Sequence, residues 1–154
     1  GFTIIELLIV IAIIGILATL VLTNFQGAQA KGRDTVRQND INAMYQKLEE
    51  YYNENGGYPN EAVTIANAKT LFPGIDEGAV AYDNAGTETA VSTTFTDGAA
   101  LAATPDADDT TEYILALYGA GCDGTTAANK CASYVLAGFQ ETDTTADYIR
   151  NSLN

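Results

Sequence analysis

The sequence predicts an α+β fold, in which a long N-terminal helix of about residues 3–53 packs its C-terminal half on a small antiparallel β-sheet. Three observations predict it. Residues 2–22 are almost entirely apolar, the residues that follow keep a helical spacing of apolar side chains, and no proline occurs before Pro59. Beyond that proline, short apolar segments alternate with Gly-, Thr- and Asp-rich stretches, which is typical of strands joined by loops.

The composition excludes several functional classes. The 154 residues include 7 Lys and Arg, 20 Asp and Glu, 2 Cys and no His, and the formal net charge is -13. A chain without histidine cannot form a Ser-His-Asp triad or a zinc site with His ligands. An acidic chain also offers few cations to a phosphate backbone, so we expect no binding of nucleic acid by the acidic part. We therefore expect neither an enzyme nor a cofactor.

The run from Phe2 to Leu22 contains a single charge, Glu6. As a helix it is about 31 Å long, close to the ~30 Å thickness of the hydrocarbon core of a bilayer. A cleaved signal peptide is the alternative, but it begins with basic residues, and the first basic residue here is Lys31. Three parts are predicted: a hydrophobic membrane or filament-core helix (1–25), the amphipathic half of that helix (26–55) and a globular head (56–154).

The second half of the helix carries its own pattern. Four residues follow the spacing of one helical face and should pack on the sheet: Ile41, Met44, Tyr45 and Leu48. Four charged residues before them are expected on a solvated face: Arg33, Asp34, Arg37 and Asp40. The helix should end near Asn53, because two glycines and a proline follow.

The head is expected to contain one short helix, within residues 61–72, and several strands. The predicted strands are Ala79–Tyr82, Thr87–Thr96, Glu112–Tyr118 and Cys131–Phe139. Strands at this spacing predict an antiparallel meander with the long helix behind it.

The first sixty residues resemble the type IV pilin family, whose relatives include the pseudopilins of type II secretion. Gly1, Phe2 and Glu6 match the family's processing signal, in which prepilin peptidase cuts after a glycine, the following Phe is methylated and a glutamate lies five residues after the cut. Residues 52–59 are similar to the family's YxxxxGxYP-like helix end, and Cys122 and Cys131 match its C-terminal cysteine pair. Two departures are the glycine present at position 1 and Thr23, where the family often has a proline that loosens the helix.

The resemblance implies a structural subunit that polymerises through its N-terminal helix into a helical cell-surface filament. Its implied partners are identical subunits, the cytoplasmic membrane before assembly, prepilin peptidase and an assembly machinery with an ATPase. Phe2 and Glu6 are implied in assembly, with Glu6 pairing to the α-amino group of an adjacent subunit. A tolerated charge near the membrane surface is the alternative for Glu6. A pseudopilin, or a minor pilin that binds a target or takes up DNA, remains open as the function.

The head contains three further candidate sites. Cys122 and Cys131 predict a disulfide in an extracytoplasmic domain, with two buried free thiols as the alternative. The Thr-rich residues 87–96 could accept O-linked sugar. Three acids could hold calcium, as in related major pseudopilins, although a solvated acidic loop is the simpler reading: Asp106, Asp108 and Asp109.

Overall fold

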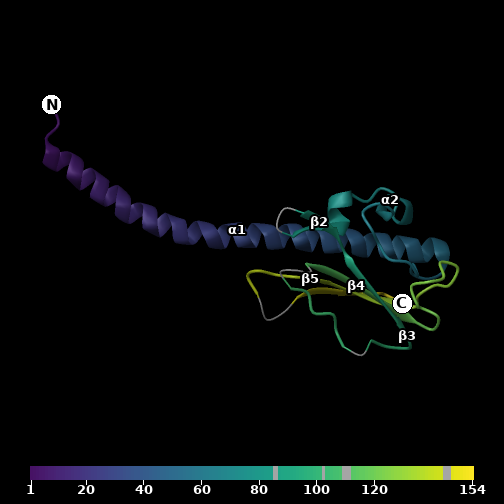
Figure 1. The fold of residues 1–154 in the computed structure, drawn as a ribbon. Helices are drawn as coiled ribbons and strands as arrows, with labels where there is room; N and C mark the ends of the chain where they lie inside the picture. The colour runs from purple at the N-terminus through teal and green to yellow at the C-terminus, as the bar shows by residue number, and fades with distance from the viewer. Residues whose placement is uncertain (85–86, 102, 109–111, 144–146) are drawn as a thin grey trace.

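The computed structural model describes residues 1–84, 87–101, 103–108, 112–143 and 147–154. One long helix, α1 (Ile4–Asn55), extends far beyond a small head, so the molecule is a rod joined to a globule (Figure 1). At 1.5 Å per residue α1 is about 78 Å long. Its N-terminal half curves gently away from the head, and its C-terminal half lies along the head.

Local residues set both ends of α1. The Thr3 hydroxyl accepts a hydrogen bond from the Glu6 N–H at 3.3 Å, and the Glu6 carboxylate accepts one from the Thr3 N–H at 2.8 Å. This reciprocal pair is a capping box. At the other end Gly56 has a φ of 73°, and its N–H donates to the Tyr52 carbonyl at 2.8 Å. The helix therefore continues two residues beyond the predicted end.

The described residues of the head form two short helices and two sheets. The helices are α2 (Ala68–Leu71) and the 3-10 helix η1 (Glu77–Val80). A two-stranded antiparallel hairpin consists of β1 (Ala81–Asn84) and β2 (Thr87–Ala90). A four-stranded sheet has the order β3-β4-β5-β6, with strands β3 (Ser92–Asp97), β4 (Tyr113–Gly119), β5 (Ser133–Gly138) and β6 (Tyr148–Asn151).

The α+β class is confirmed, and the strands differ from the prediction in four ways. The predicted strand Ala79–Tyr82 is wrong at Ala79 and Val80, which belong to η1, so that β1 begins only at Ala81. β3 and β4 are parallel. Two strands can pair in parallel only when the connection between them runs back to the end at which the first strand began. The predicted strand Thr87–Thr96 is two strands in different sheets, separated at Val91, whose N–H donates to the Val80 carbonyl at 2.9 Å. β6 was not predicted, since four residues with a mixed polar pattern give little periodic signal.

The core lies between α1 and the four-stranded sheet. From the helix Ile41, Met44 and Leu48 are fully buried, while Tyr45 packs at the edge of the core. The fully buried sheet residues are Leu115, Leu117, Tyr134, Leu136 and Ala137. The helix and sheet approach each other closely at Gly138, where an added Cβ would lie 2.9 Å from the Cγ1 of Ile41. Glycine at this position therefore permits the observed packing distance.

The predicted solvated face of α1 is wrong for two of its residues. Asp34 and Arg37 are only 3% and 7% exposed, whereas Arg33 is exposed and Asp40 half-buried. The alternating steps of three and four residues from Asp34 to Leu48 place the two charged side chains on the same face as the apolar stripe. The buried face of the helix therefore continues into polar residues where α1 leaves the head.

Candidate assembly surface and neck cluster

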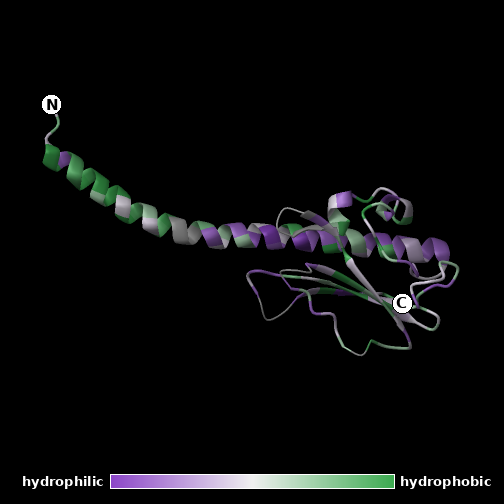
Figure 2. Ribbon diagram, in the orientation of Figure 1, coloured by the Kyte–Doolittle hydropathy of each residue, from purple (hydrophilic) through white to green (hydrophobic). Residues whose placement is uncertain are grey.

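The N-terminal half of α1 is the largest exposed apolar surface of the described chain. Every described large apolar side chain of residues 2–25 is at least 50% exposed. Figure 2 shows this half as a continuous hydrophobic segment, in contrast with the mixed pattern of the second half. α1 is long and apolar enough to cross a membrane, by length and composition. Apolar area on this scale marks a membrane or protein contact, because it is unstable in water.

Glu6 is the one carboxylate on this surface. Its side chain turns back to the start of its own helix and accepts hydrogen bonds from the Thr3 N–H at 2.8 Å and the Thr3 hydroxyl at 2.7 Å. Phe2 is 96% exposed and lies just outside this cap, beside Gly1. Sequence reasoning missed the role of Thr3, although the Thr-x-x-Glu spacing of a capping box was the available signal. The carboxylate that could meet a neighbouring subunit is thus already oriented at the helix terminus.

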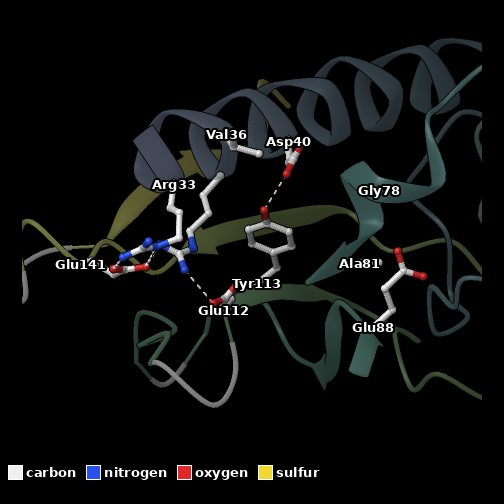
Figure 3. A pocket seen from close by; sticks show the side chains of 10 residues that line it. Arg33, Val36, Asp40, Gly78, Ala81, Glu88, Glu112, Tyr113 and Glu141 are labelled. Atoms are coloured by element: carbon white, nitrogen blue, oxygen red, sulfur yellow. Dashed lines mark hydrogen bonds and ion pairs between the residues drawn. The ribbon is translucent and has the colours of Figure 1, made fainter. Parts of the chain in front are cut away.

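At the junction of α1 with the head, five charged residues form a group that we call the neck cluster: Arg33, Asp34, Arg37, Glu112 and Glu141. Figure 3 shows Arg33, Glu112 and Glu141 of this group. The Arg37 guanidinium is at its centre, 3.1 Å from Asp34, 2.7 Å from Glu112 and 2.8 Å from Glu141. Burial alone would lower the pKa of Arg37, but its pairs with Glu112 and Glu141 raise it above the ordinary value. Arg37 is therefore charged and fully paired.

Asp34 joins the helix to the turn that follows β5. Its carboxylate accepts hydrogen bonds from the N–H groups of Glu141 and Thr142, at 2.8 and 2.9 Å, and from the Thr142 hydroxyl at 2.5 Å. Burial would raise the pKa of Asp34, but these hydrogen bonds and Arg37 hold it below its ordinary value. The hydrogen bond from Arg33 is the largest cause that lowers the pKa of Glu141, to about 2. Both carboxylates are ionised in the folded protein at neutral pH.

The sequence contains a signal for only some members of the neck cluster. Asp34 and Arg37 fall on the helical stripe that Ile41 continues, so their spacing was the available signal. Glu112 and Glu141 carry no local signal, because 75 residues separate Glu112 from Arg37 and 108 separate Glu141 from Arg33.

Cys122 and Cys131 form the predicted disulfide, with Cα atoms 4.8 Å apart and both side chains fully buried. Asn60, only 1% exposed, fills the loop between them. Its amide nitrogen donates to the Gly121 and Thr126 carbonyls at 3.2 and 3.1 Å, and its oxygen accepts from the Gly124 N–H at 2.7 Å. The loop is thus ordered by one buried side chain from the segment after α1.

The acidic loop contains two of the three proposed calcium ligands among the described residues. Asp106 and Asp108 lie near Asp147, whose pKa is raised by burial and by these two charges. The Asp147 carboxylate accepts a hydrogen bond from the Ala107 N–H at 2.6 Å. Asp109 lies outside the described residues. Within the described ranges, no group of three His, Cys, Asp or Glu side chains is placed to hold a metal ion.

Several known proteins are similar to this chain. Fimbrial protein EcpC of Eikenella corrodens is 33% identical over 124 residues, which cover 80% of this chain and 76% of that protein. The type IV major pilin protein PilA of Myxococcus xanthus is 38% identical over 68 residues, 44% of this chain and 31% of that protein. Type II secretion system core protein G of Escherichia coli is 38% identical over 76 residues, 47% of this chain and 52% of that protein. The chain thus spans between a third and about half of the length of the last two relatives.

No family model matches the chain, and no solved structure matches it.

Proposed function

Because the chain belongs to the superfamily of type IV pilins and type II secretion pseudopilins, we propose that it is the major structural subunit of a type IV pilus. Members of this superfamily are structural proteins and not enzymes. The observation that carries the proposal is the bare apolar half of α1. Residues 1–25 form the membrane anchor and then the filament core, residues 26–55 support the head, and residues 56–154 form the outer surface.

In the membrane the apolar half contacts lipid, and the head lies on the outer side, where the subunits of a surface filament assemble. Prepilin peptidase cuts between Gly1 and Phe2, and Phe2 is then methylated. In the filament the same apolar surface contacts identical helices, so lipid is exchanged for protein of similar polarity. The assembly machinery supplies the work of extraction. Head-to-tail contacts of this kind are open and give filaments instead of closed rings.

Glu6 sets the position of each incoming subunit by pairing with the α-amino group of a neighbour. A carboxylate among apolar side chains is costly to bury unless a cation compensates it. Glu6 is the only acid in the first 33 residues, so no other carboxylate of the helix can replace it. Its capped position at the helix start keeps the carboxylate beside the terminus where the neighbour's amine would lie.

The test compares Glu6→Ala with Glu6→Gln. The Gln side chain can still cap the helix at Thr3 but carries no charge. If the charge drives docking, both variants lose surface fibres while membrane-fraction blots show normal subunit levels. Glu54→Gln, at the exposed C-terminal end of the same helix, is the matched control and should form fibres normally. Normal fibre yield from Glu6→Gln would show that Glu6 acts by capping alone.

A second candidate, a type II secretion pseudopilin, is favoured by the 38% identity to core protein G over 76 residues. Deletion of the gene separates the two. A pilus subunit is required for sheared surface fibres seen by electron microscopy, whereas a pseudopilin is required for release of secreted proteins into the medium. Loss of secretion with fibres intact would favour the pseudopilin.

A further inference from the structure

A pocket of about 510 Å³ lies between α1 and the head beside the neck cluster, and we call it the side pocket (Figure 3). Val36 and Asp40 of α1, Glu88 of β2 and Tyr113 of β4 line it, together with residues of the neck cluster. Val36 is 59% exposed, and it is the only large apolar side chain in the described part of α1 beyond Phe25 that is mostly exposed. An isolated exposed apolar side chain, separate from the apolar half of α1, therefore lines the side pocket.

The charges of the side pocket do not balance. Arg33 and Arg37 are both engaged by the carboxylates of the neck cluster. Asp40 accepts a hydrogen bond from the Tyr113 hydroxyl at 2.6 Å, and neither Asp40 nor Glu88 has an ion pair with any described residue. Figure 3 shows Arg33 on one side of Tyr113 and Glu88 on the other. Two carboxylates thus face the pocket without a cation.

One basic side chain of the described residues is also left without a partner. Ion pairs engage four basic residues, namely Arg33, Arg37, Lys47 and Lys69. Lys130 donates to the Tyr51 hydroxyl, and Arg150 donates to Asn42. The exposed Lys31 ammonium makes no ion pair or side-chain hydrogen bond with the residues that the structure describes.

The helix offset that pairs Glu6 with a neighbour's α-amino group also brings Lys31 close to the neighbour's side pocket. If the α-amino group of one copy lies level with Glu6 of its neighbour, the two parallel helices are offset by four or five residues, about 6 to 7.5 Å. The same offset brings Lys31 of the first copy level with residues 35–36 of the neighbour. Val36 lines the side pocket, and Asp40 lies one turn further along the same helix. A long, flexible lysine side chain can cover such a remaining distance.

We propose that the side pocket receives the Lys31 ammonium of a neighbouring copy, in the same register that pairs Glu6 with the neighbour's α-amino group. The stem of Lys31 contacts Val36, and the ammonium lies between Asp40 and Glu88. The inference rests on the proposed filament. It adds a second contact between neighbouring copies, on the head side of the apolar half of α1. The Lys31 ammonium compensates part of the negative charge of the neighbouring head, so the acidic heads repel each other less when they pack together.

Zero-length carbodiimide cross-linking of sheared fibres tests the contact, because the reagent joins a lysine amine only to a carboxylate that it touches. We expect a ladder of subunit multimers on denaturing gels, and a peptide in which Lys31 is joined to Glu88 or Asp40. Lys31→Gln should remove the ladder. Lys47→Gln, which removes a lysine paired to Glu50 on its own helix, should leave it. A ladder unchanged in Lys31→Gln, or Lys31 joined only within single subunits, overturns the proposal.

Charge exchange gives a second, independent test. Lys31→Glu and Glu88→Lys should each lower fibre yield roughly five-fold, as expected for loss of a partly exposed ion pair together with a new like-charge contact. The double variant should restore most of the yield, which a defect in folding or insertion would not allow. Wild-type yield from Lys31→Glu contradicts the proposal. If fibres form and depend on Glu6 but not on Lys31, the Lys31 contact is wrong and the proposed function stands. If the unaltered chain forms no fibres, the proposed function itself is wrong.

Discussion

The Arg37 guanidinium lies 2.7 Å from the Glu112 carboxylate and joins α1 to the start of β4 across 75 residues of sequence. Apolar side chains attach the rest of the helix to the sheet, but at the neck the attachment is made by charges. Because Arg37 is nearly inaccessible to water, its pairs are screened little by salt. The turns of α1 around Arg37, where the helix first contacts the head, are therefore held to it by buried ion pairs.

Arg37→Leu should lower the free energy of unfolding of the head by about 3 kcal/mol, because it leaves Asp34 and Glu112 as uncompensated, largely buried charges. Urea unfolding of the detergent-solubilised chain, followed by circular dichroism, measures the change. Arg33→Leu is the matched control. It removes a guanidinium that pairs with the same Glu141 but is largely exposed, so it should cost less than about 1 kcal/mol. Equal losses from both variants would contradict the assigned role of burial.

Stability should also fall in acid. The folded-state pKa of Glu141 is about 2, below its ordinary 4.5, so its contribution is present above that ordinary value and is lost as the pH falls through about 2. Asp34, whose pKa is also lowered, acts in the same direction. Burial raises the pKa of Asp40, which opposes the trend.

Urea midpoints measured between about pH 6 and pH 2 test this prediction. The midpoint of the unaltered chain should fall over the acid part of the range, and that of Glu141→Gln should fall less, from a lower starting value. A Glu141→Gln profile parallel to that of the unaltered chain would mean that Glu141 is not linked to folding.

Gly138→Ala should destabilise the head by about 1 to 3 kcal/mol, because the new methyl group would lie 2.9 Å from Ile41 in a packed core. The control is Gly98→Ala, where the added Cβ meets nothing within 4 Å. Thermal unfolding of both variants gives the comparison. An unchanged melting temperature for Gly138→Ala would show that helix and sheet can separate without cost.

Replacing both Cys122 and Cys131 by serine should lower stability by about 2 to 3 kcal/mol, since the bond closes a loop of about ten residues in the unfolded chain. Chemical denaturation with and without reductant measures the loss. Reductant should have no effect on the double variant and should lower the midpoint of the unaltered chain to the same value. A larger loss in the double variant would indicate that the serines also disturb the packing around Asn60.

Removal of residues 1–25 should give a soluble monomer, because it deletes nearly all of the exposed large apolar side chains of the helix. Analytical ultracentrifugation of the shortened chain measures its association state. Filaments formed by that chain would contradict the assignment of the apolar half as the filament core.

The sequence by itself determined the long helix, its apolar first half and its packing stripe, because helical periodicity and hydrophobicity are local properties that a single segment expresses. It also determined the disulfide, since two cysteines allow one intramolecular pairing. Which charged side chains are buried and which are solvated did not follow from the local sequence. Asp34 and Arg37 look solvated in the sequence because nothing near them reveals Glu112 and the turn at Glu141.

Only the tertiary structure decided which of those charges are buried, since burial depends on partners more than 70 residues away that the sheet brings to the neck. It also decided the parallel pairing of β3 with β4, because strand direction follows from the path of the connecting segment and not from the strands' own residues. The side pocket arises for the same reason. Its two carboxylates without an ion pair, Asp40 and Glu88, belong to separate elements, and they line the same pocket only because the folded head packs against the helix.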